Sequence, residues 1–105
     1  MTNSWHQVAS ADEIEVEDVI QVKVLDKVLA VYNAKGNYYA THDLCTHGHA
    51  CLSDGVVIGD RIECPLHQGR FHIPSGKPDG APVSVPIETF PVKVVDGQIY
   101  VQIVE

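Results

Sequence analysis

The chain has 105 residues, of which 45% are hydrophobic and 20% are charged, the composition of one globular domain and not of a disordered chain, a collagen-like repeat or a coiled coil. Its 7 Lys and Arg residues against 14 Asp and Glu residues give a formal net charge of −7, which argues against nucleic acid and anionic membranes as partners. No apolar run approaches the ~20 residues that cross a bilayer. The N-terminal residues have neither the basic nor the apolar segment of a secretory signal, so we expect a cytoplasmic protein.

Alternating apolar and polar residues predict short β-strands along most of the chain. The expected strands are residues 19–25, 28–32, 38–40, 56–58, 61–63, 92–95 and 99–104. The strongest hairpin signal is Asp96-Gly97, because this pair favours the type I′ turn that joins two antiparallel strands. A second tight turn is expected at Asp26-Lys27.

The only helix signal is the capping-box spacing of Ser10 and Glu13, which predicts about one helical turn. We therefore expect an all-β fold, a small antiparallel sandwich or barrel in a single domain over residues 1–105. Between about residues 44 and 82 the sequence becomes rich in Gly, Pro, Cys and His. This texture predicts a loop-rich subdomain carried by the β scaffold, the place where functional residues often lie.

Two short motifs in this segment carry the chemistry. The first is Cys45-x-His47 and the second is Cys64-x-x-His67, and 16 residues separate them. Each motif follows a strand-like segment, and a predicted hairpin joins them, so the two loops are placed side by side. The three cysteines are an odd number and cannot form a complete disulfide framework. The motifs instead offer two sulfur and two nitrogen ligands to one metal centre.

Two kinds of centre accept two Cys and two His ligands. A structural zinc ion accepts them, although its ligand pairs usually leave two to four residues between the ligands and Cys45 and His47 leave one. The alternative is a [2Fe-2S] cluster in which two His replace two Cys on one iron. Two irons give each loop two anchor points, so a short Cys-x-His motif need not wrap around a single ion.

With their flanking residues, these motifs resemble a Rieske-type ferredoxin, the small ferredoxin component of bacterial multicomponent aromatic-ring-hydroxylating dioxygenases. The resemblance covers almost the whole chain and includes Gln68-Gly69-Arg70-Phe71, Ser75-Gly76-Lys77 and Pro82. It implies one Rieske [2Fe-2S] cluster, with Cys45 and Cys64 on the buried iron and His47 and His67 on the outer iron. It also implies that Pro82 lies in a third loop that covers the cluster.

The resemblance implies a one-electron carrier and not an enzyme. Its donor would be a flavin-containing NAD(P)H-dependent ferredoxin reductase, and its acceptor a terminal oxygenase with its own Rieske centre and non-haem iron. We expect a monomer that contacts both partners through the tip bearing His47 and His67. Two alternatives remain open at this point: a Rieske-like subunit of another oxidoreductase such as nitrite reductase, and a zinc-stabilised binding module.

Departures from the wider Rieske family bear on the reduction potential. Respiratory Rieske proteins carry a disulfide between the two loops, and Ala50 and Leu66 occupy the corresponding positions here. High-potential Rieske proteins also have a Ser just after the second His that donates a hydrogen bond to a sulfide, and Gln68-Gly69-Arg70 stand there in this chain. Because fewer hydrogen bonds to sulfur stabilise the reduced cluster less, we expect a potential toward the low end of the Rieske range of about −150 to +300 mV. Cys51 is expected to be a small buried thiol, and His49 an exposed loop residue.

Acidic residues flank the motifs and are candidates for steering a basic partner. The expected steering residues are Asp43, Asp54 and Asp79. This hypothesis requires their carboxylates to lie on the surface near the tip.

Overall fold

The computed structural model describes residues 3–46, 48–66, 68–80 and 83–104. Three antiparallel sheets account for the strands, and the helical content of the described residues is two short 3₁₀ turns. The elements are β1 Asn3–Ser10, η1 Ala11–Glu13, β2 Asp18–Val24, β3 Lys27–Ala34, β4 Asn37–His42, η2 Leu52–Asp54, β5 Val56–Ile58, β6 Arg61–Glu63, β7 Arg70–His72, β8 Thr89–Phe90, β9 Val92–Val95 and β10 Gln98–Val104. The expected all-β class is confirmed.

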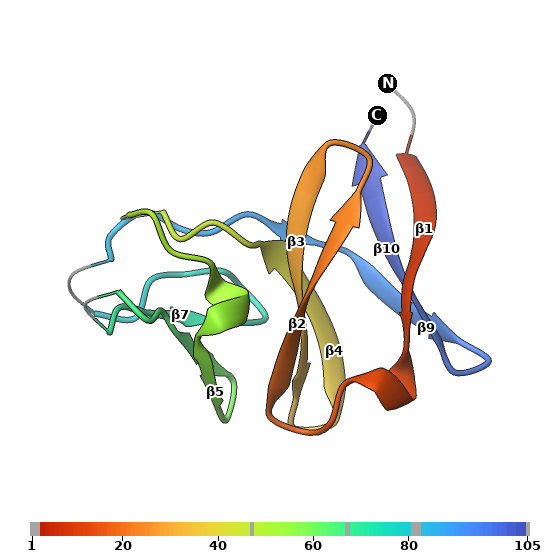
Figure 1. The fold of residues 1–105 in the computed structure, drawn as a ribbon, viewed down its shortest axis with the longest axis horizontal. Helices are drawn as coiled ribbons and strands as arrows, with labels where there is room; N and C mark the ends of the chain where they lie inside the picture. The colour runs from red at the N-terminus through yellow and green to blue at the C-terminus, as the bar shows by residue number, and fades with distance from the viewer. Residues whose placement is uncertain (1–2, 47, 67, 81–82, 105) are drawn as a thin grey trace.

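Two of the sheets form the base of the molecule, which lies on the right in Figure 1 and includes the labelled strands β1, β2, β3, β4, β9 and β10. One has the strand order β1-β10-β9 and the other β2-β3-β4-β8. Along β10 the inward residues are fully buried while their neighbours are partly exposed, as the alternating sequence requires. The buried apolar residues of the base core are Ala9, Ile14, Val24, Leu29, Val31, Ala40, Ile99, Val101 and Ile103.

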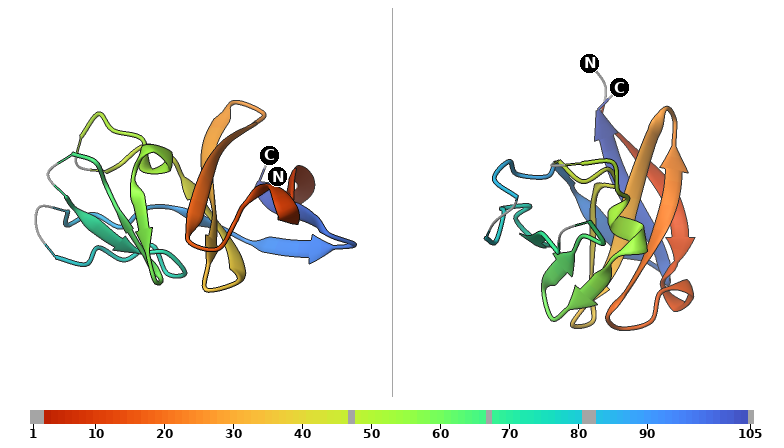
Figure 2. Two further views of the ribbon diagram at one scale, coloured as in Figure 1. Left: turned by 60° about the horizontal axis from the view of Figure 1, so that its bottom comes forward. Right: turned by 60° about the vertical axis from the view of Figure 1, so that its left-hand side comes forward.

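The third sheet belongs to a separate lobe between β4 and β8, visible to the left in Figure 2. Its strands β5, β6 and β7 have three residues each and pair in that order. This lobe contains described residues of the 44–82 segment, which is predicted to bind the cluster. Its core is continuous with one face of β3 and includes Tyr32, Leu52, Ile62, Phe71, Ile73, Val83 and Ile87.

Strand β3 is the wall that both regions share. Leu29 and Val31 point into the base core, whereas Ala30 and Tyr32 belong to the core of the lobe. Successive strand residues face opposite sides of a sheet, so a strand buried on both faces needs a nearly continuous apolar run. This burial fixes the lobe against the base.

The tight turns follow the sequence with one correction. Asp96 and Gly97 have φ values of 51° and 75°, as a type I′ turn requires. The turn predicted at Asp26-Lys27 is wrong by one residue, because Val24 pairs with Lys27 and leaves Leu25 and Asp26 as the two-residue loop. Leu25 takes a φ of 57°. Strand pairing therefore overrides the poor fit of a leucine to this conformation.

The predicted helical turn at the start of the chain is present as η1. The backbone N–H of Ser10 donates to a Glu13 carboxylate oxygen at 2.8 Å. This contact satisfies a donor that the short helix leaves without an internal acceptor. Among the residues that the structure describes, no helix has the length and apolar character to cross a membrane.

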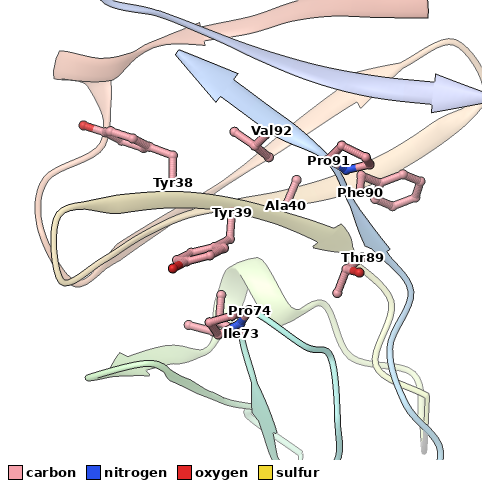
Figure 3. Close-up of a pocket in the computed structure, with 9 residues that line it drawn as sticks. All are labelled: Tyr38, Tyr39, Ala40, Ile73, Pro74, Thr89, Phe90, Pro91 and Val92. Carbon is pink, nitrogen blue, oxygen red and sulfur yellow. The ribbon is translucent and has the colours of Figure 1, made fainter. Parts of the chain in front are cut away.

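A cleft of about 490 Å³ separates the base from the lobe (Figure 3). Tyr38 and Tyr39 of β4 line it on the base side, and Ile73 and Pro74 line it on the lobe side. The remaining described lining residues are Ala40, Thr89, Phe90, Pro91 and Val92. These side chains provide apolar contact and hydroxyl groups, without the carboxylate, imidazole or thiol that acid–base or nucleophilic chemistry uses.

Candidate metal centre

The first predicted ligand, Cys45, lies in a closed loop that follows β4 and runs into η2. We call it the first loop (residues 43–53). Its side chain is 2% exposed, and its backbone N–H donates to the carbonyl oxygen of Ala50 at 2.9 Å. An antiparallel bridge between Leu44 and Cys51 joins the two sides of the loop. These contacts hold the Cys45 side chain in the protein interior.

The second predicted cysteine, Cys64, opens the loop that joins β6 to β7, here called the second loop (residues 64–69). Its side chain is fully buried, and its backbone N–H donates to the Gly69 carbonyl oxygen at 2.7 Å. The backbone N–H of Leu66 points at Cys64 Sγ at 3.4 Å. An N–H donor at this position stabilises negative charge on sulfur, as a metal-bound thiolate requires.

The two loops are in direct contact. Cys45 and Cys64 belong to the same buried cluster, and Leu66 packs against it. A Cβ on Gly48 would lie 2.6 Å from Leu66 Cδ2, so Gly48 allows the first loop to approach the second.

A third segment (residues 83–87) closes over the first loop. The hydroxyl of Thr46 donates to the Val85 carbonyl oxygen at 2.8 Å, and Val83 and Ile87 are buried. In Figure 1 the described parts of all three segments extend together to the end of the molecule away from the termini. Both buried cysteines therefore lie within a lobe built from three converging segments.

The predicted ligands His47 and His67, with Pro82, lie outside the described residues, so their roles stay predictions. The residues that are described fit a [2Fe-2S] cluster. Two buried cysteines come from two adjoining loops, one has an N–H donor at its sulfur, and the three cysteines form no disulfide. The described residues alone contain no group of three or more His, Cys, Asp or Glu arranged for a metal.

The third cysteine, Cys51, is half-buried and not buried as expected. Gln21 Nε2 lies 4.0 Å from its sulfur. Desolvation and the adjacent Asp43 carboxylate raise the pKa of the Cys51 thiol, so it stays protonated near neutral pH. His49 is exposed, as expected.

The expected role in steering a basic partner is wrong for Asp43, which is buried. For Asp79 the expected free surface charge is instead paired with an arginine. Asp43 is 1% exposed, so its carboxylate does not face a partner. Asp79 Oδ2 pairs with Arg61 Nε at 2.6 Å, which offsets its charge. Asp54 is exposed and retains the predicted surface position.

Comparison with known proteins assigns the chain to a family. Residues 4–91 match the family model described as the Rieske [2Fe-2S] domain. This chain belongs to that family. Its cofactor is accordingly a Rieske-type [2Fe-2S] cluster, which decides against the zinc alternative.

Rieske relatives of similar length match nearly the whole chain. The ferredoxin component of the naphthalene 1,2-dioxygenase/salicylate 5-hydroxylase systems of a Ralstonia species is 49% identical over 94 residues, covering 90% of each chain. The naphthalene 1,2-dioxygenase ferredoxin component of Pseudomonas putida is 45% identical and covers 98% of this chain and 99% of its own. These similarities identify a ferredoxin component, an electron carrier and not an enzyme.

A solved structure shows the same fold in a functional assembly. It is titled as a complex of reduced oxygenase and oxidised ferredoxin in carbazole 1,9a-dioxygenase. The matched chain has a TM-score of 0.88 and 40% identity, and the match covers 91% of this Rieske chain and 99% of the other. The match in length and fold confirms the Rieske ferredoxin architecture.

The sequence did not predict a pair of buried polar groups on β3 and β4, in the wall between the base and the lobe. Tyr32 OH and Thr41 Oγ1 are 2.7 Å apart in the buried wall, and Thr41 in turn donates to the His42 carbonyl oxygen. Burial, with the charges of Asp43 and Cys45, raises the pKa of Tyr32 despite its bond to Thr41. No local motif announces such a pair, because a Tyr and a Thr are ordinary strand residues.

Proposed function

We propose that this Rieske ferredoxin carries single electrons from a flavin-containing NAD(P)H-dependent ferredoxin reductase to the terminal oxygenase of an aromatic-ring dioxygenase system. The observation that carries the proposal is the convergence of Cys45 and Cys64, both buried, at one end of a chain that ferredoxin components match over nearly its whole length. We also place it in the cytoplasm, as a monomer.

Each ligand has a distinct task in this proposal. Cys45 and Cys64 would ligate one iron of the cluster, and His47 and His67 would ligate the other. When bound, the cluster takes up one electron and later releases it. The buried core around the cysteines excludes water from their sulfurs, and the Leu66 N–H stabilises the negative charge at Cys64.

The end of the lobe also offers a contact surface for partner proteins. Leu44 is 48% exposed beside Cys45. A hollow of about 380 Å³ nearby is lined by His49, Ala50, Cys51, Asp54, Pro65 and Leu66. Small, partly apolar surfaces of this kind suit transient electron-transfer encounters. We therefore propose that both partners dock here in turn.

The test reconstitutes the chain with a reductase and an oxygenase of a naphthalene dioxygenase system, using NADH and naphthalene. We expect product formation to require the ferredoxin and to saturate with its concentration. A second variant, His49→Ala, tests the docking surface, because it changes a residue of this surface without changing a proposed ligand. It is expected to raise the ferredoxin concentration needed for half-maximal rate while leaving the reduced-state electron paramagnetic resonance (EPR) spectrum unchanged.

The proposal is contradicted if the cluster-loaded protein accepts electrons from dithionite but supports no turnover with any reductase and oxygenase pair of these systems. In that case the centre exists and the partner assignment is wrong.

A further inference from the structure

A buried carboxylate lies at the neck of the first loop, two residues before Cys45. Asp43 is 1% exposed, and its carboxylate accepts three hydrogen bonds. Ser53 N–H donates to Oδ1 at 2.8 Å, while Ser53 Oγ and Gln21 Nε2 donate to Oδ2 at 3.0 and 2.8 Å. All three partners are donors, which is the environment of an ionised carboxylate.

This charge has no cationic partner among the described side chains. The arginine ion pairs lie elsewhere in the lobe, on Asp60, Asp79 and Glu63. Among the described side chains, the neutral dipoles of Ser53 and Gln21 stabilise the Asp43 carboxylate. A buried charge compensated in this way keeps a long electrostatic reach, since the surrounding protein screens it weakly.

The backbone of the same residue fastens the loop. Asp43 N–H donates to the Val28 carbonyl oxygen at 3.0 Å, and its own carbonyl accepts from Leu52 N–H at 2.7 Å. The side-chain bonds to Ser53 therefore add to a backbone bond across the loop neck. Asp43 thus ties the strand that enters the first loop to the segment that leaves it.

We propose that Asp43 is a positioning residue for Cys45 and that its buried negative charge lowers the reduction potential of the cluster. The proposal rests on cluster binding at Cys45 and is independent of which proteins exchange electrons with it. Reduction adds one electron to the centre, and an electron added near a fixed negative charge is disfavoured. Nothing in the sequence motif assigns this role.

The charge of Asp43 also acts on a neighbouring group across the loop neck. After desolvation, it is a cause of the raised pKa of the Cys51 thiol.

The test is redox titration of the isolated cluster-loaded protein with dithionite and mediators, followed by EPR. In Asp43→Asn the one-electron equilibrium should shift roughly tenfold toward the reduced form, about 59 mV upward. Thermal stability should fall, because an amide nitrogen replaces one acceptor oxygen. The matched control is Asp54→Asn, which removes the same charge from an exposed side chain in the same stretch of chain. It should shift the equilibrium by less than about twofold, since water screens it.

Ser53→Ala is expected to shift the reduction potential in the opposite direction. It removes one donor and leaves the charge, so the carboxylate is less compensated and the potential should fall, by about threefold in the equilibrium or 28 mV. A general loosening of the loop does not predict opposite shifts from two changes at one contact.

Equal shifts in Asp43→Asn and Asp54→Asn would overturn the role of the buried charge. If Asp43→Asn fails to hold a cluster while Asp54→Asn loads normally, positioning is supported and Ser53→Ala decides the electrostatic part. An unchanged potential in Ser53→Ala would then overturn it. None of these readouts uses a partner protein, so failure of electron transfer to an oxygenase leaves the result standing.

Discussion

The base and the lobe are stabilised in different ways. The base has strands of up to eight residues and a core whose buried apolar side chains are all aliphatic. The lobe has three-residue strands, and its core includes Cys45 and Cys64, which we propose as cluster ligands. Hydrophobic burial and long hydrogen-bonded ladders stabilise the base. The lobe depends more on loop contacts and on its cofactor, because metal binding contributes directly to folding where ligands come from separate loops.

The strongest test of this difference removes a ligand. We expect Cys64→Ala to abolish the cluster, seen as loss of visible absorption and of the EPR signal after dithionite. Amides of the lobe, such as Ile62 and Phe71, should lose hydrogen-exchange protection, whereas Val101 of the base keeps its own. Cys51→Ala is the control and should retain the cluster. Equal loss of protection in both regions would mean that they fold as one unit.

The second test weakens the base. Ile103 is fully buried in its core, so Ile103→Ala should lower the free energy of unfolding by about 2–5 kcal/mol. The neighbouring Val104 is 55% exposed, and Val104→Ala should change it by less than about 0.5 kcal/mol. Denaturant unfolding of the loaded protein measures both. The reduction potential of the cluster should be the same in both variants and the wild type. A changed potential in Ile103→Ala would show that the base tunes the centre.

The third test is made at the shared wall. Tyr32→Phe removes the hydroxyl that lies 2.7 Å from Thr41 Oγ1 and should cost about 1–3 kcal/mol, because Thr41 is left with an unmet acceptor in the interior. Tyr39→Phe is the matched control, since Tyr39 lines the cleft in Figure 3, where water reaches its side chain. Thermal unfolding compares the two variants. Equal destabilisation would exclude a specific role for the buried pair.

The smallest effect is expected from the ion pairs on the outside of the lobe. Desolvation raises the pKa of Asp60, but Arg61, followed by Lys35 and His72, lowers it more, so the pKa lies below its ordinary value. A depressed carboxyl pKa contributes stability above the unfolded value of about 3.9, and this contribution is lost as the pH falls through the folded pKa. The melting temperatures of wild type and Arg61→Ala should differ slightly at pH 6–7 and converge in acid. High salt should also reduce the difference. A difference that grows in acid would contradict this assignment.

The sequence predicted the regular parts of this molecule well. The alternating residues of β10 and the Asp96-Gly97 turn follow local rules, and both are present as expected. The spacing also predicts Cys45 and Cys64 as ligands; the structure buries both, and their role as ligands stays a prediction. The turn at Leu25 was misplaced because cross-strand pairing, and not local preference, sets its position.

The supporting contacts of the centre were not predictable in the same way. Asp43 looked like a surface charge because an aspartate beside a loop usually is one. Its burial depends on Ser53 and Gln21, which lie 10 and 22 residues away in sequence. The ion pair of Asp79 is with Arg61, 18 residues away in sequence. Such long-range partners become visible only when the fold brings them together.

The pairing of Asn3 with Val104 places the described ends of the chain side by side, and Figure 1 shows them far from the converging loops. A domain whose ends are neighbours can be inserted into, or fused with, another polypeptide without distorting either. Here the point of insertion or fusion would lie opposite the proposed docking surface. Linking this ferredoxin to an oxygenase by a flexible tether would therefore raise the local concentration of the electron donor while leaving the proposed docking surface accessible.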